Sequence, residues 1–226
     1  MKNLFLTIIL SLFLCEIAFA QQPTPDFQTV KTEKGMMILN NNKTQPFSFL
    51  AAGGNPKGEQ NDDGSLFIQT DRNGVLVYFV KTEWFADKTK KLNENEIPAA
   101  HRKYEVANFE QSVGQKINVD KEGTETFKVH DLRKGKDEFT ELQTVYWSYL
   151  ATDPNIPNRL YFQNVVIGDQ ILMLGMVFNK STDIEKIRGL LKEMFESITL
   201  LPAPSIKKVA PVKKTPIKQK RKKAKS

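Results

Sequence analysis

The clearest pattern of hydrophobic and polar positions in the chain predicts a β-hairpin in its first half. Apolar and β-branched residues fill positions 66–70 and 75–80, on either side of Asp71-Arg72-Asn73-Gly74. Asn-Gly accepts the positive φ that a tight hairpin turn requires, so the two runs are expected to pair. Residues 51–65, just before the hairpin, are rich in Gly, Asn, Asp and Pro and predict a loop.

A second hairpin is expected near the C-terminal end. Positions 160–167 and 170–178 flank Gly168-Asp169, a turn of the Gly-first hairpin type. The segment ILMLGMVF, at the end of this hairpin, is apolar on both faces. This pattern predicts a strand in the middle of a sheet, with cover on both sides.

Weaker signals predict further strands. Residues 26–33 and 36–39 form short runs separated by Gly35. Residues 127–130 alternate apolar and polar side chains, and 139–150 is rich in β-branched and aromatic residues, with a turn at Lys134-Gly135-Lys136 between them. Another antiparallel pair is expected there.

Two segments have the period of a helix. Residues 97–113 begin with Pro98 near the first helical position, and the stripe expected to face the sheet is Ile97, Ala100, Tyr104, Ala107 and Gln111. Residues 182–198 begin with a capping-box spacing at Thr182 and Glu185. The core-facing stripe predicted for this second helix is Ile184, Ile187, Leu190, Leu191, Met194, Phe195 and Ile198.

The first twenty residues predict an export signal. Lys2 supplies a positive start, residues 4–14 are apolar, and Ala18-Phe19-Ala20 are suited to a signal peptidase, so cleavage is expected between Ala20 and Gln21. The predicted location is periplasmic or secreted, with no transmembrane segment after signal removal. A retained membrane helix and lipidation at Cys15 are the alternatives. Signal removal also takes away the only cysteine.

The rest of the chain divides into three parts. Residues 21–25 are a short leader, residues 26–202 are long enough for a single α+β domain with its own core, and residues 203–226 are rich in Lys and Pro. The last part has no apolar period, so a disordered basic C-terminal tail is predicted.

The net charge of +7 belongs mainly to this tail. The tail carries ten cations and no acid, and without them the remaining chain has a net charge of −3. The cations predicted to bind a polyanion are Lys207, Lys208, Lys213, Lys214, Lys218, Lys220, Arg221, Lys222, Lys223 and Lys225.

Flexible cations without fixed geometry favour dense polyanions. The expected partners are an anionic envelope component, such as lipid head groups, lipopolysaccharide or a cell-wall polymer, or nucleic acid bound without sequence specificity. A protein partner is a further option. The tail is alternatively a solubilising device without a partner, or a nuclear-targeting signal if the N-terminal segment is not an export signal.

The C-terminal half resembles a known family. The block YFQNVVIGDQILMLGMVF, followed by STDIEKIRGLLKEMFESITL, is similar to the PsbP-like family, which includes small bacterial periplasmic proteins of the DcrB type. The residues that carry the resemblance are Tyr161-Phe162, Gly168-Asp169, Leu172 to Leu174 and Phe195 to Ile198. The resemblance implies a mainly antiparallel sheet sandwiched by two or three helices and a largely non-enzymatic role. The basic tail is not part of the common family pattern.

The candidate chemical groups favour no catalytic site, metal site or cofactor. His101 and His130 have no Cys, and no second His at His-x-x-x-His spacing, with which to form a zinc site. They are interpreted as surface or helix-face residues. Residues 53–59 (GGNPKGE) lack the Lys-Ser/Thr pair of a phosphate-binding loop. A calcium loop over residues 59–70 would begin with Glu59 and place Thr70 where a bidentate Glu is required, so a conformational role is favoured.

Two further sets of residues bear on function. Asn42-Lys43-Thr44 and Asn179-Lys180-Ser181 are glycosylation sequons. Core packing is favoured over a pocket for the aromatic residues Trp84, Phe85, Tyr146, Trp147, Tyr149, Tyr161 and Phe162.

The leading hypothesis is an exported, non-enzymatic binding or assembly-support domain tethered electrostatically to an envelope or extracellular polyanion. The alternative is a secreted enzyme or small-ligand carrier with a site among the aromatic strands and the Gly-rich loop.

Overall fold

The computed structural model describes residues 27–62, 64–84, 92–93, 96–114, 116–150, 158–179 and 181–203. The strands among them are β1 (Phe27–Thr32), β2 (Gly35–Asn40), β3 (Phe47–Ala52), β4 (Lys57–Gln60), β5 (Leu66–Gln69), β6 (Gly74–Lys81), β7 (Asn118–Asp131), β8 (Glu138–Leu150), β9 (Asn158–Ile167), β10 (Gln170–Asn179) and β11 (Thr199–Leu200). The helices are α2 (Ile97–Val113) and α3 (Ile184–Glu196), with a short 3-10 turn, η1, at Thr82–Trp84.

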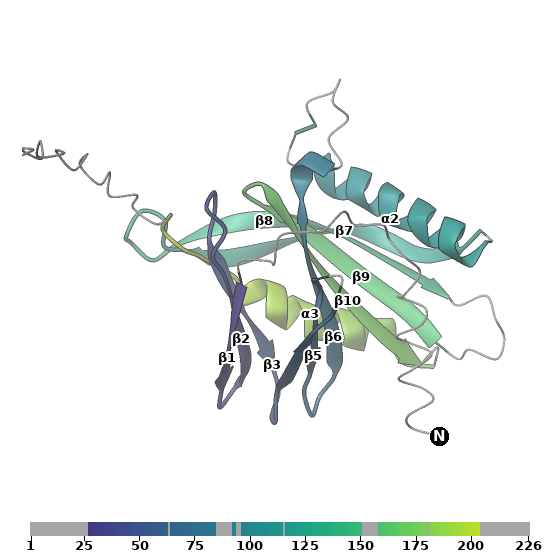
Figure 1. Ribbon diagram of the computed structural model, residues 1–226, viewed down its shortest axis with the longest axis horizontal. Coiled ribbons are helices and arrows are strands. Elements are labelled where there is room, and N and C mark those ends of the chain that lie inside the picture. Colours follow the sequence, from purple (N-terminus) through teal and green to yellow (C-terminus); the bar gives the residue numbers. More distant parts are fainter. Residues whose placement is uncertain are drawn as a thin grey trace, which may run out of the picture.

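These eleven strands form one sheet in the order β1-β2-β3-β11-β7-β8-β9-β10-β6-β5-β4 (Figure 1). Neighbouring strands are antiparallel, except that β11 runs parallel to β7. No helix in the described part of the chain is long and apolar enough to cross a membrane. The predicted signal, leader and most of the tail lie outside the described residues.

The prediction of a sheet sandwiched by two or three helices is wrong. The sheet is nearly closed, because it curls until β1–β3 at one end lie against β4–β6 at the other. The Phe79 ring of β6 lies 5.5 Å from that of Phe27 in β1 and 6.1 Å from that of Phe47 in β3, between ring centroids. Strand twist accumulates across so wide a sheet. The sheet therefore covers much of its own inner face.

The inner core fills the curled sheet together with α3. It joins Phe47 and Phe49 of β3 to Ile68 of β5 and Val77 of β6, all nearly or fully buried. Phe195 of α3 stacks on Phe127 of β7, with 5.4 Å between ring centroids. Side chains from both ends of the sheet thus share one hydrophobic cluster.

A smaller outer core lies on the opposite face of β8, β9 and β10, under α2. Its buried members are Val145, Trp147, Tyr149, Leu160, Phe162 and Met173. Strand β10 contributes Met173 to the outer core and Leu172 and Leu174 to the inner core. This confirms the prediction that β10 lies mid-sheet with cover on both faces.

Helix α2 has the predicted bounds but packs through a different face. The predicted stripe is largely outward, since Tyr104 is 41% exposed and Ala107 is exposed. The face against the sheet carries Pro98 and His101, with Phe109 packed against the outer core. The outer core is small, so a few contacts at the helix ends decide its rotation, and the weak periodicity of residues 97–113 did not indicate this face.

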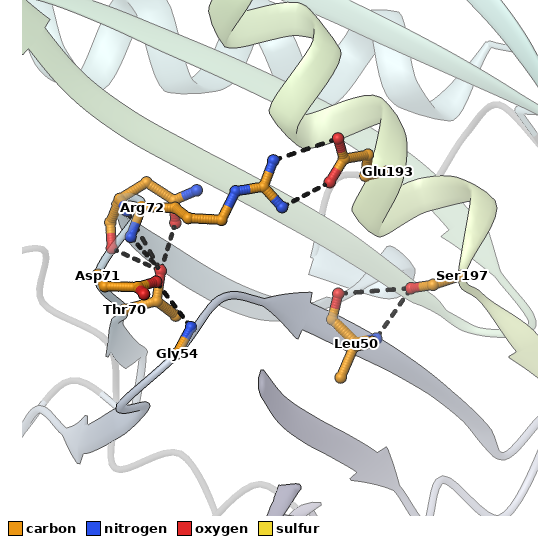
Figure 2. Close-up of polar contacts among 8 residues, drawn as sticks. Leu50, Gly54, Thr70, Asp71, Arg72, Glu193 and Ser197 are labelled. Atoms are coloured by element: carbon orange, nitrogen blue, oxygen red, sulfur yellow. Dashed lines mark hydrogen bonds and ion pairs between the residues drawn. The ribbon is translucent and has the colours of Figure 1, made fainter. Parts of the chain in front are cut away.

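Helix α3 packs with the predicted stripe but begins with a different cap. Asp183, not Thr182, is the N-cap residue, and its Oδ1 accepts a hydrogen bond of 3.0 Å from Glu185 N. At the other end, Ser197 Oγ accepts a hydrogen bond of 2.8 Å from Leu50 N of β3 (Figure 2). The helix is therefore fixed to the sheet at its C-terminal end.

Both predicted hairpins form, with β5–β6 and β9–β10 in antiparallel register. The interpretation of residues 51–65 as a loop is wrong in part, because β3 extends to Ala52 and Lys57–Gln60 form β4. Strand β7 begins at Asn118, well before the predicted start, and β11 was not predicted. These polar or very short segments are strands because a partner strand lies beside them.

Candidate functional site

The ten cations predicted to bind a polyanion lie outside the described residues, but the segment that leads to them is described. Strand β11 is inserted between β3 and β7 in the middle of the sheet. His130 N donates to Ile198 O at 3.2 Å, Leu132 N to Leu200 O at 2.9 Å, and Leu201 N to Pro46 O at 2.9 Å. The start of the tail is therefore held on both sides by backbone hydrogen bonds.

The turn between β7 and β8 lies beside this point. Arg133 Nε donates to Asp131 Oδ1 at 2.8 Å, and Arg133 Nη2 donates to Asp131 Oδ2 at 2.5 Å. The hydrogen bond from the Arg133 guanidinium lowers the pKa of Asp131 to about 2. Gly135 takes the turn position at φ 72°, with open space around it. The turn is thus held by an ion pair at its base and faces solvent at its tip.

An exposed aromatic side chain follows the turn. Phe139 is 64% exposed, more than any other large hydrophobic residue in the described part of the chain. Its ring lies 4.7 Å from the His130 ring, between centroids, and His130 Nδ1 lies 2.8 Å from Asp137 Oδ1. We call residues 131–139 together with 199–203 the tail-root surface. The sequence did not predict that Phe139 is exposed, because Phe139 begins the aromatic-rich run 139–150, whose large side chains were expected to be packed.

The two histidines lie apart, on α2 and β7. Both were interpreted as surface or helix-face residues. His101 does lie on a helix, but it is not at the surface, since its side chain is fully buried. Asn164 Nδ2 donates to His101 Nδ1 at 2.9 Å and to Pro98 O at 3.2 Å, and His101 Nε2 lies 3.2 Å from Glu105 Oε1. Among the described residues, no group of three His, Cys, Asp or Glu side chains is placed to hold a metal ion.

The Gly-rich segment 53–59 contacts the β5–β6 turn through Gly54 (Figure 2). Gly54 N donates to Asp71 Oδ1 at 2.6 Å, and Asp71 N donates to Gly54 O at 3.0 Å. Arg72 in the same turn forms an ion pair with Glu193 of α3 at 2.9 Å. These contacts tie the β5–β6 turn to the segment that follows β3 and to α3, so Gly54 has a structural role.

The residues of the calcium-loop register have conformational partners. Asn61 Nδ2 donates to Ser65 Oγ at 2.8 Å, and Thr70 Oγ1 accepts from Arg72 N and Asn73 N, each at 3.2 Å. Glu59 is exposed on β4, and Asp63 lies outside the described residues. The side chains that are described hold turns, as acidic and amide residues commonly do.

The predicted aromatic set is divided between two faces of the sheet. Trp147, Tyr149 and Phe162 belong to the outer core under α2. Tyr146 and Tyr161 stack on each other on the inner face, with ring centroids 5.9 Å apart. The side chain of Trp84, and Phe85, lie outside the described part. Burial raises the pKa of Tyr149 and of Tyr161, so both phenols stay protonated.

A polar cluster on the inner face was not predicted. Arg188 of α3 donates to Glu125 Oε1 of β7 and lies over the Tyr146 ring, 4.8 Å from its centroid. Gln163 Nε2 donates to Glu125 Oε2 at 3.1 Å and to Thr144 Oγ1 at 2.8 Å. The signal available in the sequence was the polar residues at alternate positions of β8 and β9. The cluster pairs its charges internally and joins α3 to the sheet.

The two glycosylation sequons differ in access. Asn42 is buried, and its Nδ2 donates to Asp169 Oδ1 at 2.8 Å. Asn179, at the end of β10, is exposed, and its Oδ1 accepts hydrogen bonds from Ser181. In the folded chain only the second asparagine of these two presents its side chain to solvent.

No protein-family model matches the chain, and no curated protein matches it. Among solved structures, it is similar to the solution structure of cyanobacterial PsbP (CyanoP) from Synechocystis sp. PCC 6803. That similarity has a TM-score of 0.45 and 9% sequence identity, over 80% of this chain and 95% of that chain. The protein found bears the name of the family whose resemblance was expected from residues 161–200, at low identity.

Proposed function

We propose that this chain is an exported, non-enzymatic binding or assembly-support domain, held at an envelope or extracellular polyanion by its polycationic tail. The observation that supports this proposal is the position of β11. The strand that leads into the tail is hydrogen-bonded between β3 and β7, in the middle of the sheet. A polyanion bound by the tail would therefore be attached to the domain through a strand that is paired on both sides.

The charge distribution supports an electrostatic tether. The tail carries ten cations, whereas the rest of the chain has a net charge of −3. Neutralising phosphates releases counterions, so such binding is strong at low salt and weakens steeply as salt is added. The remaining chain has a net negative charge and therefore does not favour binding to a polyanion. The tail is the part of the chain that attracts the polyanion.

The contacts of the polar side chains support a non-enzymatic role. His101 is engaged by Asn164, and the Glu125 carboxylate accepts from Arg188. Each of these groups links a helix to the sheet, which is a structural use of a titratable side chain. The division of the aromatic residues between two faces also argues against one pocket built from them and the Gly-rich segment.

The proposal is tested by salt titration of binding to anionic vesicles, lipopolysaccharide and duplex DNA. The mature chain, from Gln21 to Ser226, is compared with a chain of equal length in which the ten tail cations are replaced by glutamine. We expect the mature chain to bind DNA with a log–log salt slope of about −5 if roughly six charges engage. The glutamine version should lose most of this binding and this slope.

Equal binding by the two versions would reject the tether. A third version, ending at Pro204, shows whether the length of the tail matters apart from its charge. Circular dichroism of each version checks that the fold is retained. Export is tested separately by fractionation and N-terminal sequencing, where a mature start at Gln21 is expected and an unprocessed start at Met1 contradicts the export signal.

A further inference from the structure

We propose that the tail-root surface docks on an anionic lipid bilayer, with the Phe139 ring inserted among the head groups and the tail cations lying along them. This inference rests on the proposed electrostatic tether and names the polyanion as a membrane surface. It adds a contact made by the folded domain, which the tail alone does not provide. The evidence is the exposure of Phe139, its distance from the tail and the shape of the β7–β8 hairpin.

Phe139 is held rigidly in an exposed position. It pairs with His130 across β8 and β7, and its ring leans on the His130 ring. His130 is in turn fixed by Asp137, 2.8 Å from its Nδ1. At 64% exposure, most of a phenyl ring faces water without cover in the described structure. Burying such a surface is favourable in the absence of any charge.

The start of the tail lies on the same face, two strands away. Thr199 of β11 pairs with His130 of β7, and His130 pairs with Phe139 of β8. Residues that pair across neighbouring strands point to the same side of a sheet. Two strand spacings amount to about 10 Å. Strand β11, which precedes the tail, therefore lies close to the exposed ring.

The hairpin gives this surface its shape. In Figure 1 the β7–β8 turn extends beyond the neighbouring strands, and the yellow C-terminal segment lies beside it. The exposed cations of the turn are Arg133, Lys134 and Lys136, while Arg133 is paired with Asp131 and Lys134 lies 3.7 Å from Glu138. The acids of the turn balance these cations, so the turn contributes the apolar contact and the tail contributes the charge.

This combination favours a bilayer over a nucleic acid. A nucleic acid offers phosphates to the tail but no apolar interior to the Phe139 ring. A bilayer offers phosphate groups for the tail and an apolar interior for the ring. An apolar contact adds to the electrostatic attraction of a polybasic segment, so the two together bind an anionic membrane more strongly than either alone.

The test compares Phe139→Ser with Tyr104→Ser in the full mature chain. Tyr104 is an exposed aromatic residue of α2, outside the tail-root surface. Binding is measured to vesicles of anionic phospholipid, to vesicles of zwitterionic phospholipid and to duplex DNA. We expect Phe139→Ser to weaken binding to anionic vesicles about tenfold, the change expected if most of a phenyl ring leaves water. Its salt slope should stay that of the mature chain.

A second measurement reports insertion directly. Cys15 is the only cysteine of the chain and lies in the predicted signal, so Phe139→Cys creates a single labelling position in the mature chain. A polarity-sensitive dye at position 139 should shift to shorter wavelength with anionic vesicles and not with DNA. The same dye on Tyr104→Cys should not shift.

The outcomes separate this inference from the proposed function. If Phe139→Ser changes vesicle binding by less than about twofold while the glutamine-tail version loses it, membrane docking of this surface is wrong and the tether stands. If the glutamine-tail version binds as the mature chain does and Phe139→Ser does not, the tether is wrong and the docking proposal is overturned with it, because it includes the tail cations; only an apolar contact at Phe139 is then left. An equal effect of Phe139→Ser on DNA overturns the assignment to a bilayer.

Discussion

His101 and Asn164 join α2 to the sheet through a buried contact, and breaking this contact tests its energetic role. Both side chains are fully buried. Asn164 Nδ2 donates to His101 Nδ1 at 2.9 Å and to Pro98 O at 3.2 Å. His101 Nδ1 is therefore the acceptor, and its Nε2, which carries the proton, faces Glu105 Oε1 at 3.2 Å. The proposed substitutions are Asn164→Leu, His101→Leu and the two together.

The expected magnitudes follow from the groups left without a partner. Asn164→Leu leaves His101 Nδ1 buried without the amide donor, and such a group costs about 1–3 kcal/mol, whereas Pro98 O keeps its bond within the helix. We expect a loss of about 1–3 kcal/mol in the free energy of unfolding. His101→Leu should cost about 1–2 kcal/mol, since Asn164 keeps its bond to Pro98 and Glu105 is partly solvated.

The double substitution should cost less than the sum of the single ones. Once both side chains are apolar, neither His101 Nδ1 nor the Asn164 amide remains to be satisfied. The coupling is expected to be about 1–2 kcal/mol. Unfolding in urea at pH 7, followed by circular dichroism, gives the three free energies. Gln143→Leu, at an exposed position of β8, is the control for a polar-to-apolar change and should have little effect.

Additive losses would refute the reasoning, because they would show that the two side chains stabilise the fold independently. Hydrogen exchange gives a second check. The amides of α2 should exchange faster in either single variant, whereas amides of β10 should not. Faster exchange in both elements alike would mean that the contact supports the whole fold and not the attachment of α2.

Two further predictions concern the turns. Arg133→Gln removes the hydrogen bond that lowers the pKa of Asp131 from 3.8 to about 2. Arg133 should add about 1–2 kcal/mol of stability above pH 4, and this contribution should be lost as pH falls toward 2. The measurement is the difference in urea unfolding free energy between the native chain and Arg133→Gln. A difference that does not vary between pH 6 and pH 2 would contradict this prediction. Gly35→Ala places a Cβ 2.1 Å from Ala51 O at φ 146°. It should lower the free energy of unfolding, measured by thermal unfolding, by more than about 2 kcal/mol. Gly135→Ala, at a position with open space around it, should lower it by only about 1 kcal/mol.

Local features of the fold follow from short stretches of sequence. The Gly168-Asp169 turn is correctly predicted, with Gly168 at φ 64°, because turn geometry depends on the φ preferences of adjacent residues. The β5–β6 hairpin also forms, but the predicted positive φ at Asn73-Gly74 is wrong, since Gly74 already belongs to β6 and pairs with Gln69. The bounds of α2 and the core stripe of α3 also follow from local spacing. The cap of α3 lies one residue away from the prediction, since Thr182 and Asp183 both suit an N-cap.

The features that were missed depend on residues far apart in the chain. Strand β4 carries only exposed residues, and β11 has two residues, so neither has a pattern of its own. The face that α2 turns to the sheet includes Pro98 and His101, which contact Asn164, a residue distant in sequence. The polar cluster of Arg188 and Glu125 likewise exists only once α3 lies along β7.

By itself the sequence determines where turns and helices occur and how charge is divided between the tail and the rest of the chain, because these depend on composition and neighbouring residues. The tertiary structure alone decided that the sheet curls on itself in place of a layered sandwich, because twist accumulates only when all eleven strands are paired. It also decided that Phe139 is exposed beside the root of the tail, since β11, β7 and β8 become neighbours only in the folded sheet.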